Sequence, residues 1–267
     1  MAITYLSGQR VQGSSTATST PTYSGDFGTW ATTGSQVTES SDVVSFAITT
    51  RIANHTVTND LGSALSNSEW VMRCKLEFTT LTAGGGSTIY FELGVGSANS
   101  SSFPENSGVS FDLIALQSRI GSGGGDTGWG CVGYNSTGAL NNPESPTMDT
   151  VATTQIYYVE IKRLSTTSMS IGLYDSADFD SLIMPIETKT IDVGVTGLQY
   201  LRVGNGGVGS ESSTGNVNTG TVRDFQIWNA TTSATQDDKD SVTDVPVGSE
   251  FEETDTRRFY QYGGGGN

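Results

Sequence analysis

The stretch from Gln155 to Asp175, QIYYVEIKRLSTTSMSIGLYD, constrains the fold of this chain more than any other. Apolar and polar residues alternate on both sides of a short connection, Leu164 to Ser168. This period of two predicts an antiparallel hairpin with one buried face and one face toward water. Because a lone hairpin is not stable in water, the rest of the chain must supply a covering layer. The expected buried side chains are Tyr157, Val159, Ile161, Met169, Ile171 and Leu173.

Further segments along the chain have the same period. Glu69 to Leu81 and Thr221 to Trp228 are the clearest of them, and the first places five core-type residues on one face. About ten such strands alternate with Gly- and Ser-rich turns, and no amphipathic segment of helix length interrupts them. The sequence therefore predicts an all-β fold, an antiparallel two-sheet jelly-roll sandwich with extended N- and C-terminal arms. The five core-type residues on one face of the segment from Glu69 to Leu81 are Trp70, Met72, Cys74, Leu76 and Phe78.

Changes in composition divide the chain into three parts. Residues 1–42 are expected to form an N-terminal arm, and residues 43–230 the sandwich. Residues 231–267 are expected to form a linker, a terminal β segment and a flexible Gly tail. Two aromatic residues, Phe27 and Trp30, either anchor the arm on the sandwich or belong to an ordinary first strand and a long loop.

The charge of the chain excludes some partners. Its 28 acidic and 13 basic residues give a net charge of −15, without a clustered basic face. We therefore expect no binding to nucleic acid and no adhesion to anionic membranes. No apolar run approaches the roughly 18 residues that a membrane span needs, so we expect no membrane insertion. The opening also lacks a basic leader followed by an apolar run, which favours synthesis in a cytoplasm without a signal peptide.

The order of the strands resembles the concanavalin-A-like lectin/glucanase superfamily, including laminin-G-type jelly rolls. The resemblance rests on the Trp-led strand EWVMRCKLEF, the hairpin IYYVEIKR…SMSIGLYD and the closing strand TVRDFQIWN. The matching pieces of the family pattern are Tyr158 to Arg163, Ser170 to Asp175 and Asp224 to Trp228. The likeness covers about residues 43–230. It implies the sandwich fold and is poorly specific for function.

The two ends resemble a different class of protein. MAITYLSGQRVQG at the start and VPVGSEFEETDTRRFYQY near the end are similar to the termini of structural proteins from tailed phages and environmental viruses. This resemblance implies a structural protein of a virion or extracellular assembly that self-associates through its arms. The implied partners are copies of the chain or other assembly proteins, with host-surface glycan as a further ligand. The alternative is a carbohydrate-binding, lectin-like module without catalysis.

Catalysis is not expected. Glucanases of the resembled superfamily carry closely spaced carboxylates on one strand, but Glu92 and Glu160 have no acidic partner at that spacing. The single histidine, His55, lies in an Asn/Thr-rich loop and is better explained as a surface residue than as part of a triad. Cys74 and Cys131 lack metal-ligand spacing, and they either pair or remain buried thiols. We therefore predict no catalytic residue and no bound metal.

Two weaker sites compete with structural explanations. Asp175, Asp178 and Asp180 could hold Ca²⁺ at a sandwich rim, but an acidic surface loop is the better explanation, so no cofactor is assigned. Trp129 and Tyr134 flank a Gly-rich turn and could stack on sugar rings. For Trp129 a core position is favoured, because tryptophan is highly buried on average.

Overall fold

The computed structural model of the chain is built from strands. It describes residues 10–13, 17–18, 20–49, 55–82, 89–100, 111–120, 128–136, 140–141, 155–206, 217–236, 250–253 and 259–261. These residues divide into two compact units, one from Pro21 to Thr232 and one from the two ends of the chain. Within the described residues, no helix is long and apolar enough to cross a membrane.

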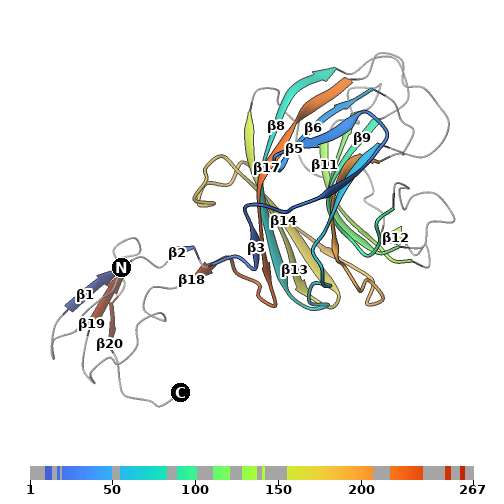
Figure 1. The fold of residues 1–267 in the computed structure, drawn as a ribbon. Coiled ribbons are helices and arrows are strands. Elements are labelled where there is room, and N and C mark those ends of the chain that lie inside the picture. Colours follow the sequence, from blue (N-terminus) through green and yellow to red (C-terminus); the bar gives the residue numbers. More distant parts are fainter. Residues whose placement is uncertain are drawn as a thin grey trace. The chain divides into compact units, whose positions relative to one another are not determined.

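The larger unit is a sandwich of two antiparallel sheets, which confirms the predicted fold class (Figure 1). The seven-stranded sheet has the order β12-β11-β10-β9-β16-β7-β4. Its strands are β12 (Leu140–Asn141), β11 (Gly128–Tyr134), β10 (Leu113–Ile120), β9 (Ile89–Gly96), β16 (Tyr200–Gly206), β7 (Thr56–Asp60) and β4 (Trp30–Thr33).

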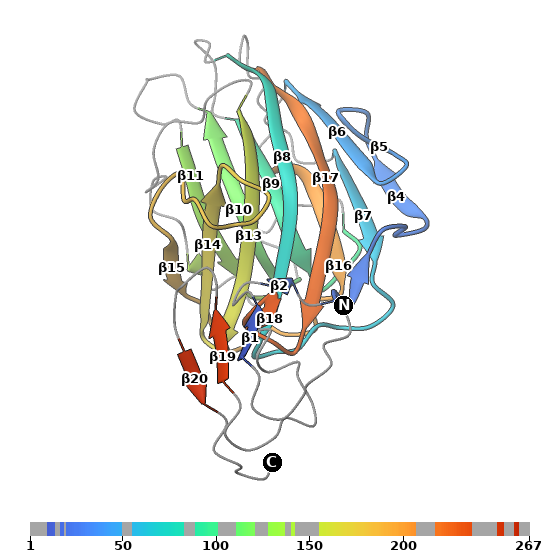
Figure 2. The same ribbon diagram turned by 90° about the vertical axis from the view of Figure 1, so that its left-hand side faces the viewer.

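The second layer is an eight-stranded sheet in which β3 pairs with β17 beside the main path β15-β14-β13-β8-β17-β6-β5. Figure 2 faces this sheet, with β15 at one side and β5 at the other. Its strands are β15 (Glu187–Thr190), β14 (Ser168–Tyr174), β13 (Ile156–Ser165), β8 (Trp70–Thr82), β17 (Val217–Asn229), β6 (Val43–Ile48), β5 (Val37–Ser40) and β3 (Tyr23–Ser24).

The predicted hairpin is β13 and β14, and its register places Val159 opposite Leu173 and Ile161 opposite Ile171. All six predicted inward side chains are buried. The five inward residues of β8 are buried as well, and they join the same core as the hairpin. Alternation therefore identified the inward faces correctly, because successive side chains of a strand point to opposite sides of the sheet. The other face of the hairpin was expected to meet water, but Glu160, Ser170 and Tyr174 on that face are also buried.

The core between the sheets is strongly aromatic. Phe78 lies at its centre, with ring centroids 5.6 Å from Phe46, 5.7 Å from Phe91 and 5.2 Å from Trp129. Tilted and edge-to-face contacts of this kind add stability beyond the area that they bury. These rings come from both sheets, so the aromatic contacts hold the two layers together.

The sandwich begins earlier than the sequence indicated. Residues 21–42, expected to belong to an arm, lie in the sandwich unit, and β4 and β5 extend its two sheets. Phe27 and Trp30 pack on Phe225 of β17, with ring centroids 6.0 and 5.6 Å away. β5 forms a local hairpin with β6, whereas β4 pairs with β7, a strand more than twenty residues further along the chain that local composition does not identify.

The second unit contains residues 1–20 and 233–267. Strand β1 (Arg10–Gly13) pairs in parallel with β19 (Glu250–Glu253), and β19 pairs in antiparallel with β20 (Phe259–Gln261). A short ladder joins β2 (Ala17–Thr18) to β18 (Thr235–Gln236). The two ends of the chain therefore pair with each other, where the sequence had suggested separate arms.

Candidate functional site

The two rings predicted to contact glycan are buried on β11. Trp129 lies in the main core, with its ring centroid 5.3 Å from that of Tyr157. Tyr134 is 1 % exposed and packs in a smaller cluster with Phe111, Leu113 and Val132 on the other side of the seven-stranded sheet. In this arrangement neither ring offers a face to a sugar, and both stabilise the sandwich.

The acidic loop predicted as a calcium alternative lies between β14 and β15. Asp175, Asp178 and Asp180 are exposed, and Asp180 Oδ1 accepts a hydrogen bond of 2.5 Å from the Ser176 hydroxyl. In the part of the chain that the structure describes, no three His, Cys, Asp or Glu side chains are grouped to hold a metal ion. The loop does have a packing role, because Phe179 lies over the Arg73 guanidinium, 4.0 Å from its carbon to the ring centroid.

The side chain of the single histidine accepts hydrogen bonds from the backbone. His55 Nδ1 accepts hydrogen bonds from the backbone N–H of Ser35, at 2.9 Å, and of Gln36, at 3.4 Å. Burial lowers the pKa of His55, which favours the neutral imidazole that these bonds require. The Nδ1 atom of His55 therefore holds the turn between β4 and β5.

The two cysteines are free thiols, and both are buried. Desolvation raises the pKa of Cys74 and of Cys131 well above the usual value, so neither is poised as a thiolate nucleophile. The alternative that the sequence left open, a disulfide between them, is absent from this structure.

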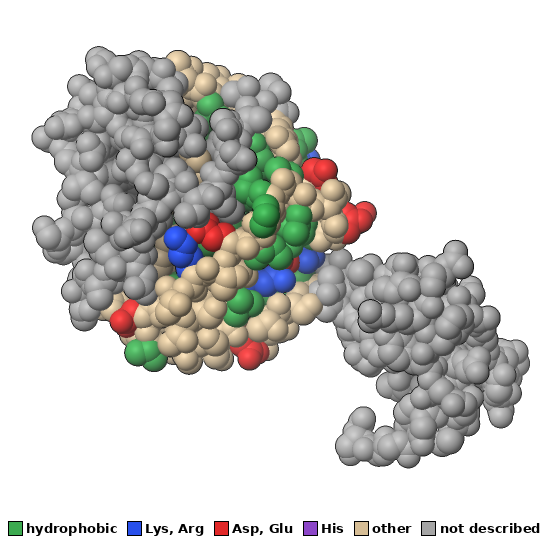
Figure 3. All heavy atoms as spheres, turned by 180° about the vertical axis from the view of Figure 1, so that it is seen from behind, with side chains coloured by type: hydrophobic (Ala, Val, Ile, Leu, Met, Phe, Trp, Pro, Cys, Tyr) green, Lys and Arg blue, Asp and Glu red, His purple; other side chains and the backbone are tan. Residues whose placement is uncertain are grey.

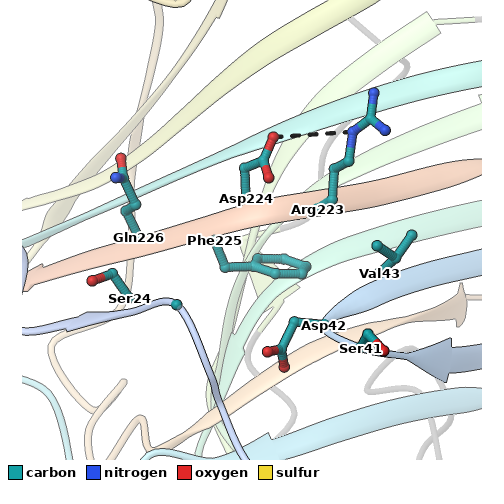
Figure 4. Close-up of a pocket in the computed structure, with 9 residues that line it drawn as sticks. Ser24, Ser41, Asp42, Val43, Arg223, Asp224, Phe225 and Gln226 are labelled. Atoms are coloured by element: carbon teal, nitrogen blue, oxygen red, sulfur yellow. Dashed lines mark ion pairs between the residues drawn. The ribbon is translucent and has the colours of Figure 1, made fainter.

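Sequence reasoning missed a groove beside an irregularity in β17. A hollow of about 630 Å³ lies between β3, the turn joining β5 to β6, and residues 223–226 of β17 (Figure 4). Here the pairing of β17 with β8 shifts register between Arg223 and Gln226, which marks a β-bulge. The lining residues are Ser24, Gly25, Ser41, Asp42, Val43, Arg223, Asp224, Phe225 and Gln226.

The bulge interrupts the pairing of β17 on the groove side. Strand β6 pairs with β17 as far as Val222, and β3 resumes the pairing at Gln226. Neither strand pairs in register with Arg223, Asp224 or Phe225. A central strand thus presents a short stretch of backbone to the groove, between the end of one neighbour and the start of the next.

The base of the groove is closely packed. Phe225 is buried against Phe27 and Trp30. Asp42 secures this cluster, since Asp42 Oδ1 accepts a hydrogen bond of 2.8 Å from Trp30 Nε1 and its two oxygens lie 3.3 Å from the backbone N of Phe27. In Figure 4, Arg223, Asp224 and Gln226 project to one side of β17, while Phe225 points the other way.

A second surface feature is apolar. Figure 3 shows hydrophobic side chains gathered on one face of the sandwich unit, among charged ones. The large hydrophobic residues exposed in the described part are Leu182, Ile186 and Val193, which flank the edge strand β15.

Comparisons with known proteins add no family. No protein-family model and no curated protein matches the sequence. Solved structures with a similar arrangement include alginate lyase Aly36B, at 10% identity and a TM-score of 0.46, covering 82% of this chain and 99% of that one. The CBM2 module of Lactobacillus casei BL23 phage J-1 evolved Dit has 12% identity and a TM-score of 0.45, with coverage of 80% and 97%. Lectin II from Ulex europaeus has 15% identity and a TM-score of 0.43, with coverage of 79% and 96%.

Enzymes and lectins both occur among these structures, and the similarity is too low to transfer a role. The chain is therefore placed by its fold alone, as an antiparallel two-sheet β-sandwich.

Proposed function

We propose that this chain is a non-catalytic structural protein of a repeating assembly, a virion or an extracellular particle, whose copies associate through the terminal unit. The observation that carries the proposal is the small sheet made by β1, β19 and β20, which forms a unit separate from the sandwich. Among the described residues β1 and β20 are its outer strands. Outer strands accept further strands through backbone hydrogen bonds, so this sheet can extend across copies.

The exposed apolar residues beside β15 support the same proposal. β15 is the outer strand of the eight-stranded sheet, and Leu182, Ile186 and Val193 lie in the chain on either side of it. An outer strand with neighbouring apolar side chains favours contact with protein over contact with water alone. The net charge of −15 keeps free copies soluble before assembly.

The chemistry of the described residues supports the absence of catalysis. Glu92 and Glu160 are buried and each lies in an ion pair with an arginine. His55 and the two thiols are held in structural roles. A chain without a poised base or nucleophile in its described part is better suited to binding and construction than to turnover.

The proposal predicts that breaking the terminal sheet abolishes assembly and spares the sandwich. Val11→Pro and Phe251→Pro each place a residue without a backbone N–H in the terminal sheet, at positions that are partners in the β1–β19 ladder. The size of the full chain would be measured by sedimentation velocity, and the fold by circular dichroism and thermal unfolding. A matched control, Ala177→Pro, lies in an exposed loop of the sandwich.

We expect multimers for the unaltered chain and for Ala177→Pro, and monomers with an intact β-sheet spectrum for the two variants in the ladder. A monomeric unaltered chain at high concentration would refute the proposal. Multimers of unchanged size in both ladder variants would do so as well.

The second candidate function is carbohydrate recognition without catalysis, with host-surface glycan as the ligand. The groove at the β17 bulge favours it, because convergent polar groups in a hollow are typical of binding sites. Screening the unaltered chain on an array of oligosaccharides, with and without Ca²⁺, tests this function directly.

A further inference from the structure

We infer that the groove at the β17 bulge binds a neutral oligosaccharide through hydrogen bonds. The inference rests on the second candidate function and gives it a location that the buried rings of Trp129 and Tyr134 do not offer. The volume of about 630 Å³ lies within the usual range of ligand pockets.

Positive backbone φ angles are concentrated at this groove. Among the described residues, five that are not glycine have a positive φ, and three of them line the groove: Ser41 at 54°, Asp42 at 61° and Asp224 at 58°. Ser41 and Asp42 form the two-residue turn of the β5–β6 hairpin, where a positive φ is usual, whereas Asp224 lies within a strand, where residues other than glycine seldom adopt it. Such strain persists where the surroundings impose it, and it is found preferentially at functional sites.

The side chains at the rim keep hydrogen-bonding capacity for a ligand. The side chain of Asp224 is 71% exposed, and its Oδ2 atom lies 4.0 Å from Arg223 Nε. The Arg223 guanidinium lies 3.7 Å from Glu77 Oε2. Both distances are longer than a hydrogen bond, so the guanidinium retains donors and the Asp224 carboxylate retains acceptors. Gln226 adds an amide, and Ser24 and Ser41 add hydroxyls.

This set of groups matches sugar hydroxyls. Each hydroxyl both donates and accepts, and the groove offers carboxylate acceptors, guanidinium donors and groups that do both. Asp42 and Asp224 outnumber Arg223, so an anionic ligand such as a uronate or a phosphate meets net repulsion. A neutral oligosaccharide avoids this cost.

The site is also preorganised. The Phe27, Trp30 and Phe225 cluster supports its base, and the Asp42 hydrogen bonds fix the adjoining turn. A ligand therefore orders little protein when it binds, which preserves affinity. The one apolar lining side chain that reaches the surface is Val43, so we expect hydrogen bonds to dominate over stacking.

The test uses the full chain and a panel of short neutral glucans, galactans and mannans, with a parallel panel of uronate and sialylated oligosaccharides. Binding would be followed by backbone amide chemical shifts and titration calorimetry. Asp224→Asn removes the rim carboxylate, and asparagine tolerates a positive φ, so the bulge is retained. The matched control is Asp178→Asn, which removes the same charge from an exposed loop outside the groove.

We expect a neutral ligand to shift the amides of residues 24–25, 41–43 and 223–226. Asp224→Asn should weaken its binding roughly tenfold, because a hydrogen bond to a charged group is lost, and Asp178→Asn should not change it. A ligand could instead shift amides outside these residues and bind the Asp224→Asn variant as tightly as the unaltered chain. That result would refute the groove as the binding site but would leave carbohydrate recognition supported. Preference for the acidic panel would refute the ligand class, and no binding on either panel would refute both the site and the second candidate function.

Discussion

Each sheet of the sandwich carries an arginine–glutamate pair on its outer face, and the two pairs are built differently. On the eight-stranded sheet, Arg73 and Glu160 are directly opposite each other in the β8–β13 ladder, and their atoms approach to 2.7 Å. On the seven-stranded sheet, Glu92 faces Gly204 and Arg202 faces Gly94, so the pair is diagonal and its atoms lie 3.6 Å apart.

The two pairs also differ in their cover. Phe179 and Trp228 lie over Arg73, and the side chains of Arg73 and Glu160 stay 8% and 3% exposed. Arg202 donates to the backbone oxygen of Ser100 and lies beneath the Phe111 ring, and the side chains of Glu92 and Arg202 are fully buried. An outer sheet face is therefore not a solvent face here, because loops close over both pairs.

The largest effect is expected when the deeper pair is broken. Glu92→Gln leaves the buried Arg202 without its carboxylate, and burial already lowers the pKa of that guanidinium. We expect the free energy of unfolding to fall by about 3–5 kcal/mol, the usual cost of breaking a buried ion pair by removing one partner. Urea unfolding followed by tryptophan fluorescence measures it, and a loss below about 1 kcal/mol would contradict the role given to this pair.

A smaller effect is expected at the Arg73–Glu160 pair, where the carboxylate has further partners. Glu160 also binds Lys162 Nζ at 2.7 Å, and the Tyr174 hydroxyl lies 3.4 Å away. Because Arg73 keeps slight contact with water and two aromatic neighbours, Glu160→Gln should cost about 1.5–3 kcal/mol in the same assay. Lys189→Gln, in the more exposed Lys189–Glu187 pair, is the control and should cost less than about 1 kcal/mol. Equal losses of unfolding free energy in Glu92→Gln and Glu160→Gln would contradict the difference described between the two outer faces.

Removing the aromatic cover should have a smaller effect again. Phe179→Ala deletes the ring that lies over Arg73 and contacts Tyr158 and Tyr174. We expect a loss of about 1–2 kcal/mol, close to the value of a partly desolvated cation–π contact. Amide hydrogen exchange at Arg73 and Glu160 should accelerate in this variant, while exchange at Glu92 stays unchanged. Unchanged protection at Arg73 would show that the loop is not its cover.

The smallest effect depends on pH. Desolvation, together with the nearby Glu160 charge and hydrogen bond, raises the pKa of Tyr174 to about 12, above its ordinary value of 10. The unfolded chain therefore loses this proton first, so the stabilisation is complete below pH 10 and is lost as the pH rises through about 12. Thermal unfolding between pH 9 and pH 12 should show a shallower decline in Tyr174→Phe than in the unaltered chain. Equal declines in thermal stability for Tyr174→Phe and the unaltered chain would show that Tyr174 does not contribute to this pH dependence.

Much of the sandwich could be predicted from alternation. The hairpin of β13 and β14 and the inward face of β8 follow from a period of two, since a strand with one buried face must alternate. β10 shows where this reasoning stops. Ile114 and Leu116 point into the main core, while Leu113 and Ala115 pack in the second cluster, so both faces are apolar and buried. Nothing local distinguishes the face toward the other sheet from the face beneath a loop.

The candidate groove could not be predicted. In the sequence, Asp224 and Gln226 occupy ordinary outward-facing positions of the last sandwich strand. The bulge becomes visible only when β8, β6 and β3 are all paired with β17. Asp42 likewise reads as a turn residue, and its bond to the Trp30 indole spans separate elements. A hint was present in the Ser41–Asp42 turn, but a turn does not reveal which strand lies opposite.

The sequence by itself determined the class of fold, most strands of residues 43–230 and the inward faces of β8, β13 and β14, because side-chain alternation and residue type act locally along each strand. The tertiary structure decided which strands are neighbours, which outer faces loops cover, and that the chain ends pair in one small sheet. These features depend on contacts between residues far apart in the chain. A period of two records only that a face is buried and carries no information about what buries it.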